Sequence, residues 1–247
     1  MNFIDMHIHL QDYDRQFATD LVKKAQKSGF KKMICTGTSP DDWEEVALWR
    51  NRYPDFIVPS FGLHPWQVGR FGENFIDVLR AYLQNFSTAP VGEIGLDGLK
   101  PDVELQKKYF EAQLHLAAEL KRPVVIHAVK AANIPHDYPK IMPEKFMIHS
   151  FNGRWEQMWE ILRYGGYISF GASIIKNRDF TKIMTDMPAD KILVESDGPY
   201  QAPVKGEKST PLFIPELVAQ IASVRGEDLE ETAQKIYENS LRFISAD

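Results

Sequence analysis

Residues 3–10 read FIDMHIHL, an apolar run that carries acidic and imidazole side chains. In an extended strand, alternate side chains lie on the same face, so His7 and His9 are expected to project to one side. Two imidazoles on one face can bind one metal ion, because zinc and its neighbours favour nitrogen ligands. A His-x-His pair is a modest signal by itself, since polar residues also occur at strand ends for structural reasons. The other strands must therefore supply further ligands.

Short apolar runs rich in Ile, Val and Phe recur along the chain and alternate with segments of helical periodicity. In residues 104–120, for example, apolar side chains repeat at spacings of three and four. This alternation is typical of βαβ units on a parallel sheet. The strands that it predicts are residues 3–10, 32–36, 56–63, 89–96, 123–128, 145–151, 167–171 and 191–196.

Eight such units favour a closed (β/α)8 barrel of the TIM type over a doubly wound sheet. The α/β fold that we expect has parallel strands and ends in a C-terminal helix pair. A length of 247 residues suits one barrel, so residues 1–247 are expected to form one barrel domain.

Local signals place some boundaries. Ser39 and Pro40 are expected to start the helix that contains Trp43, and Gly29 is expected to end the first helix in a left-handed conformation. Three prolines fall within residues 129–144, where we expect a loop.

The composition excludes several classes of protein. Hydrophobic residues make up 44% and charged residues 26% of the chain, as in an ordinary globular protein. A net charge of −5 argues against a non-specific duplex binder, so any contact with nucleic acid must be local. The single cysteine, Cys35, excludes an intrachain disulfide framework. No leader or membrane-spanning segment is recognised, and we expect a cytoplasmic location.

Titratable residues end several of the predicted strands. Burying any of them alone would cost several kcal/mol. In a barrel the carboxyl ends of all strands open on one mouth, so one or two shared cations could compensate the whole set. For a single such residue a capping role is the better interpretation, but not for six together. The six expected ligands are His7, His9, Glu93, His127, His149 and Asp197.

The remaining histidines test this interpretation. His64, in FGLHPW, lies at the same mouth and is expected either to contact substrate or to be structural. His115 and His136 receive no role. No G-x-G-x-x-G follows a strand, so a nucleotide cofactor is not indicated, and no G-x-S-x-G supports a serine hydrolase.

Taken together, the motifs DMHIHL, FGLHP, GEIGLD, PVVIHA, MIHSFNG, GGYISFG and VESDGPYQAP resemble the TatD-like metal-dependent deoxyribonucleases of the amidohydrolase-type TIM barrel superfamily. The resemblance covers nearly the whole chain. It implies hydrolysis of phosphodiester bonds, typically in DNA and often from an end. It also implies that His7, His9, Glu93 and Asp197 bind one metal, that Glu93, His127 and His149 bind a second, and that Asp197 is the base that activates water.

Two departures from the family pattern affect substrate binding. The family's Ser-Arg after the strand-five histidine is replaced by Ala128-Val129-Lys130, and its aromatic and arginine stretch after GEIGLD is replaced by Gly98-Leu99-Lys100. Lys100 and Lys130 are the candidate phosphate contacts in their place. Lysine supplies a point charge and lacks the bidentate fork of arginine.

The expected enzyme is therefore a metal-dependent hydrolase that acts on DNA or on a small phosphodiester, with Glu93 and Asp197 as catalytic residues. Zinc, manganese and magnesium are all admissible for a mixed His and carboxylate site. Because the family arginine is absent, a hydrolase of a small-molecule amide, ester or lactone is the alternative. A non-catalytic barrel that holds a structural ion ranks lower. The oligomeric state is not predicted.

Overall fold

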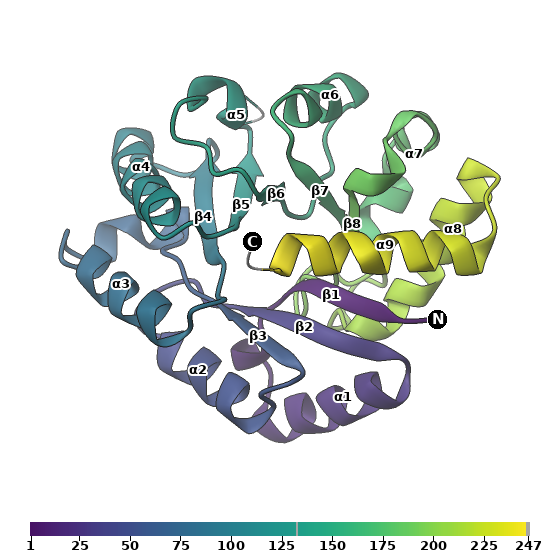
Figure 1. Cartoon of the computed structure of the whole chain (residues 1–247), viewed down its shortest axis with the longest axis horizontal. Coiled ribbons are helices and arrows are strands. Elements are labelled where there is room, and N and C mark those ends of the chain that lie inside the picture. Colours follow the sequence, from purple (N-terminus) through teal and green to yellow (C-terminus); the bar gives the residue numbers. More distant parts are fainter. Residues whose placement is uncertain (132, 246–247) are drawn as a thin grey trace.

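The computed structural model describes residues 1–131 and 133–245, and in this part of the chain eight strands lie at the centre of a ring of helices (Figure 1). All neighbouring strands are parallel, in the sheet orders β1-β2-β3 and β4-β5-β6-β7-β8. The strands are β1 (Phe3–Ile8), β2 (Phe30–Thr36), β3 (Ile57–Ser60), β4 (Val91–Asp97), β5 (Val124–Val129), β6 (Phe146–Ile148), β7 (Tyr167–Phe170) and β8 (Ile192–Val194).

Single bridges join the two sheets at both seams. Phe61, just after β3, forms a parallel bridge with Val91 of β4. Ile8 of β1 forms another with Gly198, which follows β8. The Asp197 N–H also donates to the His7 carbonyl oxygen at 2.9 Å. The strands therefore follow one another around a ring in sequence order, as expected for the TIM-type barrel.

Helices follow the strands on the outside of this ring. They are α1 (Arg15–Lys27), α2 (Trp43–Arg52), α3 (Phe75–Asn85), α4 (Val103–Glu119), α5 (Ile134–Asp137), α6 (Trp155–Arg163), α7 (Phe180–Asp186), α8 (Ile214–Arg225) and α9 (Leu229–Ile244). The last two form the expected C-terminal pair. None of the helices in the described residues is long and apolar enough to cross a membrane.

The end of α1 agrees with the sequence-based expectation, and the start of α2 does not. Gly29, just after α1, has φ +92°, which agrees with the predicted stop. The expectation that Ser39 and Pro40 start α2 was wrong, because α2 begins at Trp43. The carboxylate of Asp42 accepts hydrogen bonds from the backbone of Thr38 and Ser39, which holds these residues in a turn before the helix.

The proline-rich segment of residues 129–144 contains a single four-residue helix, α5, and is otherwise irregular where it is described. Residue 132, within this segment, lies outside the described residues. Cys35 on β2 is buried and free.

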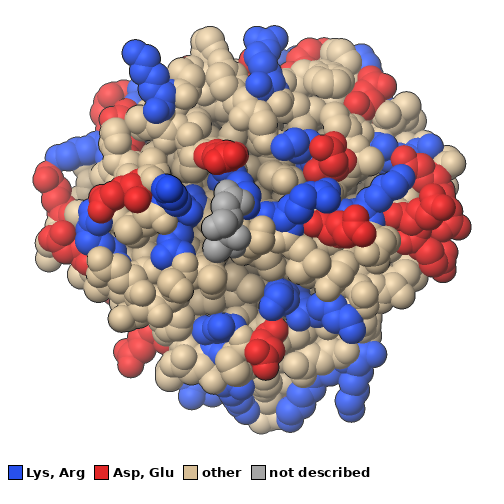
Figure 2. All heavy atoms as spheres, viewed as in Figure 1, with Lys and Arg blue, Asp and Glu red and all other residues tan. Residues whose placement is uncertain are grey.

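The amino-terminal end of the barrel is closed by α9, which crosses the centre of the ring in Figure 1. Phe243 of α9 is fully buried in a cluster with interior side chains such as Ile4, Met6 and Val125. Its ring meets that of Tyr167 edge-on, with centroids 5.7 Å apart. This face of the molecule carries Lys, Arg, Asp and Glu in mixed order (Figure 2). The closed end leaves the carboxyl ends of the strands as the open mouth of the barrel.

We predict that Phe243→Ala lowers the free energy of unfolding by about 3 to 5 kcal/mol, because it removes a buried ring from the closed end of the barrel. Urea unfolding followed by circular dichroism measures the change. Phe17→Ala is the matched control, since Phe17 is 45% exposed on α1 and should cost roughly 1 kcal/mol or less. Equal losses in the two variants would contradict the role given to α9.

Candidate metal centre

The side chains that end the strands converge at the mouth of the barrel. His7 belongs to β1, Glu93 to β4 and His127 to β5. His9 and His149 directly follow β1 and β6, and His64 and Asp197 lie in the loops after β3 and β8. All but His127 are buried, and the side chain of His127 is only 12% exposed. The structure thus brings together all six residues that the sequence predicted as ligands, with His64 beside them.

Glu93 lies at the centre of this group. Its Oε1 is 2.8 Å from His149 Nε2 and 2.9 Å from His127 Nδ1. Its Oε2 is 3.2 Å from His7 Nε2 and 3.5 Å from His9 Nε2. One carboxylate oxygen therefore faces β5 and β6, and the other faces β1.

Asp197 completes the side of the group that faces β1. Its Oδ1 lies 3.5 Å from His9 Nε2 and 3.7 Å from His7 Nε2. Its Oδ2 accepts a hydrogen bond from Gln201 Nε2 at 2.6 Å, which fixes the plane of the carboxylate. Asp197 has φ +48°, a conformation that turns the chain sharply after β8.

Hydrogen bonds behind the histidines set the orientation of two rings. His9 Nδ1 lies 2.8 Å from the carbonyl oxygen of Thr36 and must donate to it, so the neutral ring presents its Nε2 lone pair to the centre. His149 Nδ1 lies 3.3 Å from Glu195 Oε1 in the same manner. Such carbonyl and carboxylate partners are the usual supports of metal-binding histidines, because they fix the tautomer and the ring orientation.

The ring of His64 is the opposite tautomer to that of neutral His9. Its Nδ1 accepts a hydrogen bond from the Trp66 N–H at 3.1 Å, so the proton of the neutral ring is on Nε2. That Nε2–H points to Glu93 Oε1, 3.1 Å away. Burial lowers the pKa of His64, which keeps the ring neutral. In this tautomer His64 is a hydrogen-bond donor at the centre and offers no lone pair there.

His127 is supported by a carboxylate and an aromatic residue. Its Nδ1 faces Glu93, and its Nε2 lies 3.6 Å from Asp97 Oδ2. The same Asp97 oxygen accepts from Trp66 Nε1 at 2.7 Å. Trp66 is 55% exposed, and the Lys100 ammonium lies 4.3 Å from the centre of its ring. Lys100 therefore lies on the rim of the site, where Trp66 and Asp97 separate it from the expected metal ligand His127.

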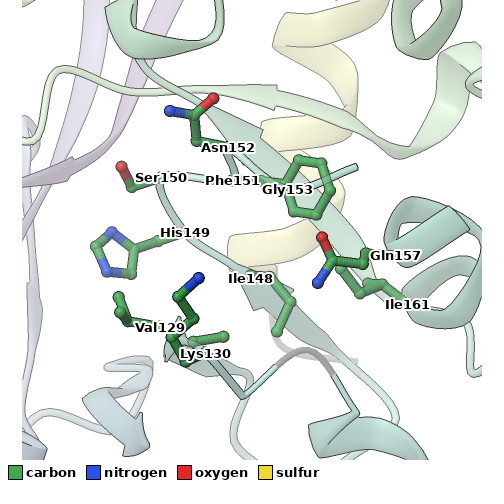
Figure 3. Close-up of a pocket in the computed structure, with 11 residues that line it drawn as sticks. Val129, Lys130, Ile148, His149, Ser150, Phe151, Asn152, Gly153, Gln157 and Ile161 are labelled. Atoms are coloured by element: carbon green, nitrogen blue, oxygen red, sulfur yellow. The ribbon is translucent and has the colours of Figure 1, made fainter. Parts of the chain in front are cut away.

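Lys130, the other predicted phosphate contact, directly follows β5. The residue is exposed, and its backbone has the left-handed conformation with φ +53°. It lines the same hollow as His149 (Figure 3). His115 and His136 are exposed and lie outside the cluster, as expected. His136 Nδ1 is paired with the Tyr164 hydroxyl at 3.1 Å.

Close packing of β4 against β5 depends on a glycine. Gly95 has φ +148°, and a Cβ atom at this position would overlap the carbonyl oxygen of His127. Only glycine allows both the backbone angle and this approach. The motif GEIGLD thus positions Glu93 beside His127.

The carboxylates at the centre are ionised. Burial by itself would raise the pKa of Glu93, but the surrounding histidines His149, His64 and His7 hold it well below its ordinary value. Burial likewise opposes ionisation of Asp197, and the hydrogen bond with His9 lowers its pKa. Both groups therefore carry a negative charge at neutral pH.

The buried histidines of the centre differ in the direction in which their pKa is shifted. Burial disfavours the charged form of His9, but Asp197 and Glu93 outweigh it and raise the pKa of His9 to about 9. His149 is also buried, and Glu93 and Glu195 raise its pKa well above the ordinary value. Burial and the nearby His149 lower the pKa of His7. Without a cation, protons on His9 and His149 thus balance the two carboxylates.

This donor set fits divalent metal ions. Two sets of ligand atoms each lie within 4.8 Å of one another, namely His7, Glu93 and His149, and His7, His9 and Asp197. The atoms of His64, Glu93 and His127 lie equally close, but His64 presents a proton there and no lone pair. The Nε2 atoms of His7 and His9 are 3.0 Å apart and point at the same space. His7 Nδ1 is buried and has no hydrogen-bond partner among the described residues. Imidazole and carboxylate donors of this kind suit zinc, manganese and magnesium.

Three carboxylates near the centre were not assigned a role from the sequence. Glu195 supports His149, Asp97 faces His127, and Asp5 accepts hydrogen bonds from the backbone of His7 and from Ser196. Asp5 is fully buried, and burial raises its pKa to about 7. The signal that could have found Asp5 and Glu195 is an acidic residue two positions from a predicted ligand, as in Asp5-Met6-His7 and Glu195-Ser196-Asp197. Asp97 has no such spacing.

Comparison with known proteins agrees with this geometry. The model of the family described as TatD related DNase matches residues 4–245. The 3′-5′ ssDNA/RNA exonuclease TatD of Pantoea vagans is 30% identical over 244 residues, which cover 91% of this chain and 93% of that protein. Human deoxyribonuclease TATDN3 is 28% identical and covers 98% of this chain, with 94% of its own length aligned.

Solved structures share the fold. YJJV, a TatD homologue from Escherichia coli K12, superposes with a TM-score of 0.90 over 99% of this chain and 98% of its own, at 23% identity. A TatD family hydrolase from Entamoeba histolytica gives a TM-score of 0.88 at 20% identity over 98% of each chain. These matches confirm the TIM-type barrel.

We predict that zinc binds more tightly as the pH rises from 6.5 towards 9. His9, with a pKa of about 9, and His149 are protonated at neutral pH, and a cation must displace those protons. Apparent affinity should increase about tenfold per pH unit for each proton displaced. Competition with a chelating dye measures this slope. His9→Ala should reduce it and His115→Ala should leave it unchanged, whereas an affinity independent of pH would contradict the assignment.

Proposed function

This chain belongs to the TatD-related DNase family, and we propose that it is a metal-dependent hydrolase that cleaves phosphodiester bonds in single-stranded nucleic acid. The relatives named above as a single-strand exonuclease and a deoxyribonuclease support this choice of substrate. The single observation that carries the proposal is the position of Glu93, whose two oxygens face two different groups of histidines. A bridging carboxylate is what a two-metal phosphodiesterase requires.

His7, His9, Glu93 and Asp197 would hold one cation, and Glu93, His127 and His149 would hold the second. When bound, divalent cations lower the pKa of water and stabilise the charge that develops on the phosphate. His9 and His149 are held in place for this role from behind, by Thr36 and Glu195. The remaining steps depend on the protein's own side chains.

Asp197 is the proposed general base. Its carboxylate is ionised, and its Oδ1 faces the centre between His7 and His9. It can therefore accept the proton of the attacking water. The hydrogen bond from Gln201 to Oδ2 leaves Oδ1 as the oxygen available for that proton.

His64 is the proposed donor to the substrate. Its Nε2–H already points into the centre, and in the free protein it donates to Glu93. A phosphate oxygen placed there would be a better acceptor once Glu93 is shared by cations. Lys130 and Lys100 are the proposed cationic contacts on the rim. The exposed Trp66 ring beside Lys100 offers a surface on which a nucleobase can stack.

The identity of the metal and the location of the enzyme are further proposals. Four histidines among the expected ligands favour zinc or manganese over magnesium, which prefers oxygen. A cytoplasmic location agrees with a single, buried and free cysteine. We also propose that residues 1–247 act as one barrel domain and require no nucleotide cofactor.

The alternative substrate class, a small-molecule amide, ester or lactone, rests on the replacement of the family's arginine by Lys130. Panels of cyclic amides and lactones, tested beside bis(p-nitrophenyl) phosphate and single-stranded DNA with free and blocked ends, separate the two. Turnover confined to the amides or lactones would refute the nuclease proposal. A metal-loaded protein inactive on every panel would point to the non-catalytic barrel.

We predict that Glu93→Ala and Asp197→Ala each abolish turnover of single-stranded DNA while the barrel remains folded. Loss of a positioned base alone lowers the rate by about 10² to 10⁴-fold, and loss of the bridging carboxylate also removes a metal ligand. Initial rates with manganese or zinc measure the effect, and circular dichroism verifies the fold. His115→Ala, an exposed histidine outside the centre, is the control. Activity retained in both carboxylate variants would refute the assignment.

A further inference from the structure

A hollow leads outward from His149 of the metal centre between the loops that follow β5, β6 and β7. Its inner part has a volume of about 280 Å³ and is bordered by His149 and Ser150. Its outer part has a volume of about 900 Å³ and is bordered by Arg154 and Arg178. Lys130, Asn152, Gly153 and Gln157 line both parts, so the two are continuous. We call this continuous hollow the basic groove.

The charged side chains that line the basic groove are all cationic. Lys130, Arg154 and Arg178 are exposed along it, and its described lining contains no Asp or Glu. Among the described residues, Lys130 and Arg154 form no ion pair. Arg178 has only its neighbour Asp179, with 3.7 Å between Nε and Oδ1, which leaves the terminal nitrogens of its guanidinium available.

The walls of the basic groove are held together by hydrogen bonds. Asn177 Nδ2 donates to the side chain and the carbonyl of Asn152, at 2.8 and 3.1 Å, and to the Gly153 carbonyl at 2.9 Å. The Trp155 N–H donates to Asp179 Oδ2 at 3.4 Å. The loops that carry Arg154 and Arg178 are thus tied to each other, so the two guanidinium groups are presented by a preformed surface.

The opposite rim of the mouth carries acidic side chains. Asp12 lies beyond β1, where it accepts a hydrogen bond from Tyr200, and Asp41 and Asp42 lie beyond β2. Arg70 is paired with Asp41 at 2.6 Å. A polyanion leaving the metal centre is therefore repelled from the β1 and β2 side and attracted to the basic groove.

We propose that the basic groove binds the sugar-phosphate backbone of the single strand beyond the scissile phosphate. Lys130 contacts the phosphate nearest to the centre, and Arg154 and Arg178 contact the phosphates that follow. This inference rests on the proposed nuclease function and adds the path of the substrate to it. A cationic groove that tracks the backbone is the general way in which proteins hold single strands without reading their sequence. Two arginines here supply the bidentate phosphate contacts that Lys130 cannot.

The test compares an Arg154→Ala/Arg178→Ala variant with wild type on three substrates. For a twelve-nucleotide oligothymidylate, kcat/KM should fall by at least about tenfold, since each charge-assisted contact is worth roughly that factor. For bis(p-nitrophenyl) phosphate and for a thymidine dinucleotide, which do not reach the outer groove, kcat/KM should stay within about twofold. Equal losses on all three substrates would overturn the proposal, because the residues would then act on the centre itself.

Binding is measured separately from turnover. Fluorescence anisotropy of the labelled oligothymidylate, with protein treated with EDTA, gives the affinity as a function of salt. Removal of two phosphate contacts should reduce the slope of log K against log [salt] by about 1.4. The control variant Lys27→Ala/Arg163→Ala removes the same charge at exposed positions away from the groove. An unchanged slope in the groove variant, or the same change in the control, would overturn the proposal.

The two measurements distinguish the failure of each idea. If wild type binds the oligonucleotide through the groove but cleaves neither it nor the phosphodiester, then the groove stands and the proposed nuclease function fails. If wild type cleaves the oligonucleotide and the groove variant does so equally well, then the function stands and the groove fails.

Discussion

A buried carboxylate surrounded by imidazoles is the interaction on which the rest of this structure depends. Glu93 is 3% exposed, and its two oxygens lie within 3.5 Å of nitrogens from five histidines. Such a group is stable only if opposite charges or shared cations compensate it. The barrel makes this possible because its strands end at one mouth, and the cluster holds those ends in turn. The site therefore depends on the fold, which brings these strand ends together.

The two ends of the barrel differ in the side chains that they contain. At the amino-terminal end, α9 and the interior cluster around Phe243 form an apolar seal. At the carboxyl end, apolar packing gives way to ionisable groups. His9 and His149 are hydrogen-bonded to Thr36 and Glu195 behind them, and Asp97 lies 3.6 Å from His127. The sealed end supplies stability from buried area, so the open end can hold groups whose burial is costly.

Much of the fold and of the ligand set could be predicted from the sequence because most of the expected ligands lie at or just beyond the end of an apolar run, although Glu93 lies within β4. His127 and His149 are examples, since a strand of Val, Ile or Met precedes each of them. The supporting residues could not be predicted in the same way, because the partner of Glu195 comes from another strand. The tautomer of His64 depends on a backbone N–H from Trp66 and is not encoded in any pattern. The start of α2 was placed too early, because the Asp42 carboxylate binds the N–H groups of Thr38 and Ser39 and holds them in a turn that precedes the helix.

The seam between β1 and β8 joins segments about 190 residues apart, through the Ile8–Gly198 bridge and the bond from Asp197 to His7. Contacts of such long sequence separation carry a high loop-closure entropy and form late in folding. His7 and His9 lie on the β1 side of this seam and Asp197 lies on the β8 side. An ion bound between them would therefore hold the two sides together. Uptake of the first ion would then coincide with the final closure of the ring, and the nascent enzyme would acquire its reactive centre only as its architecture is completed.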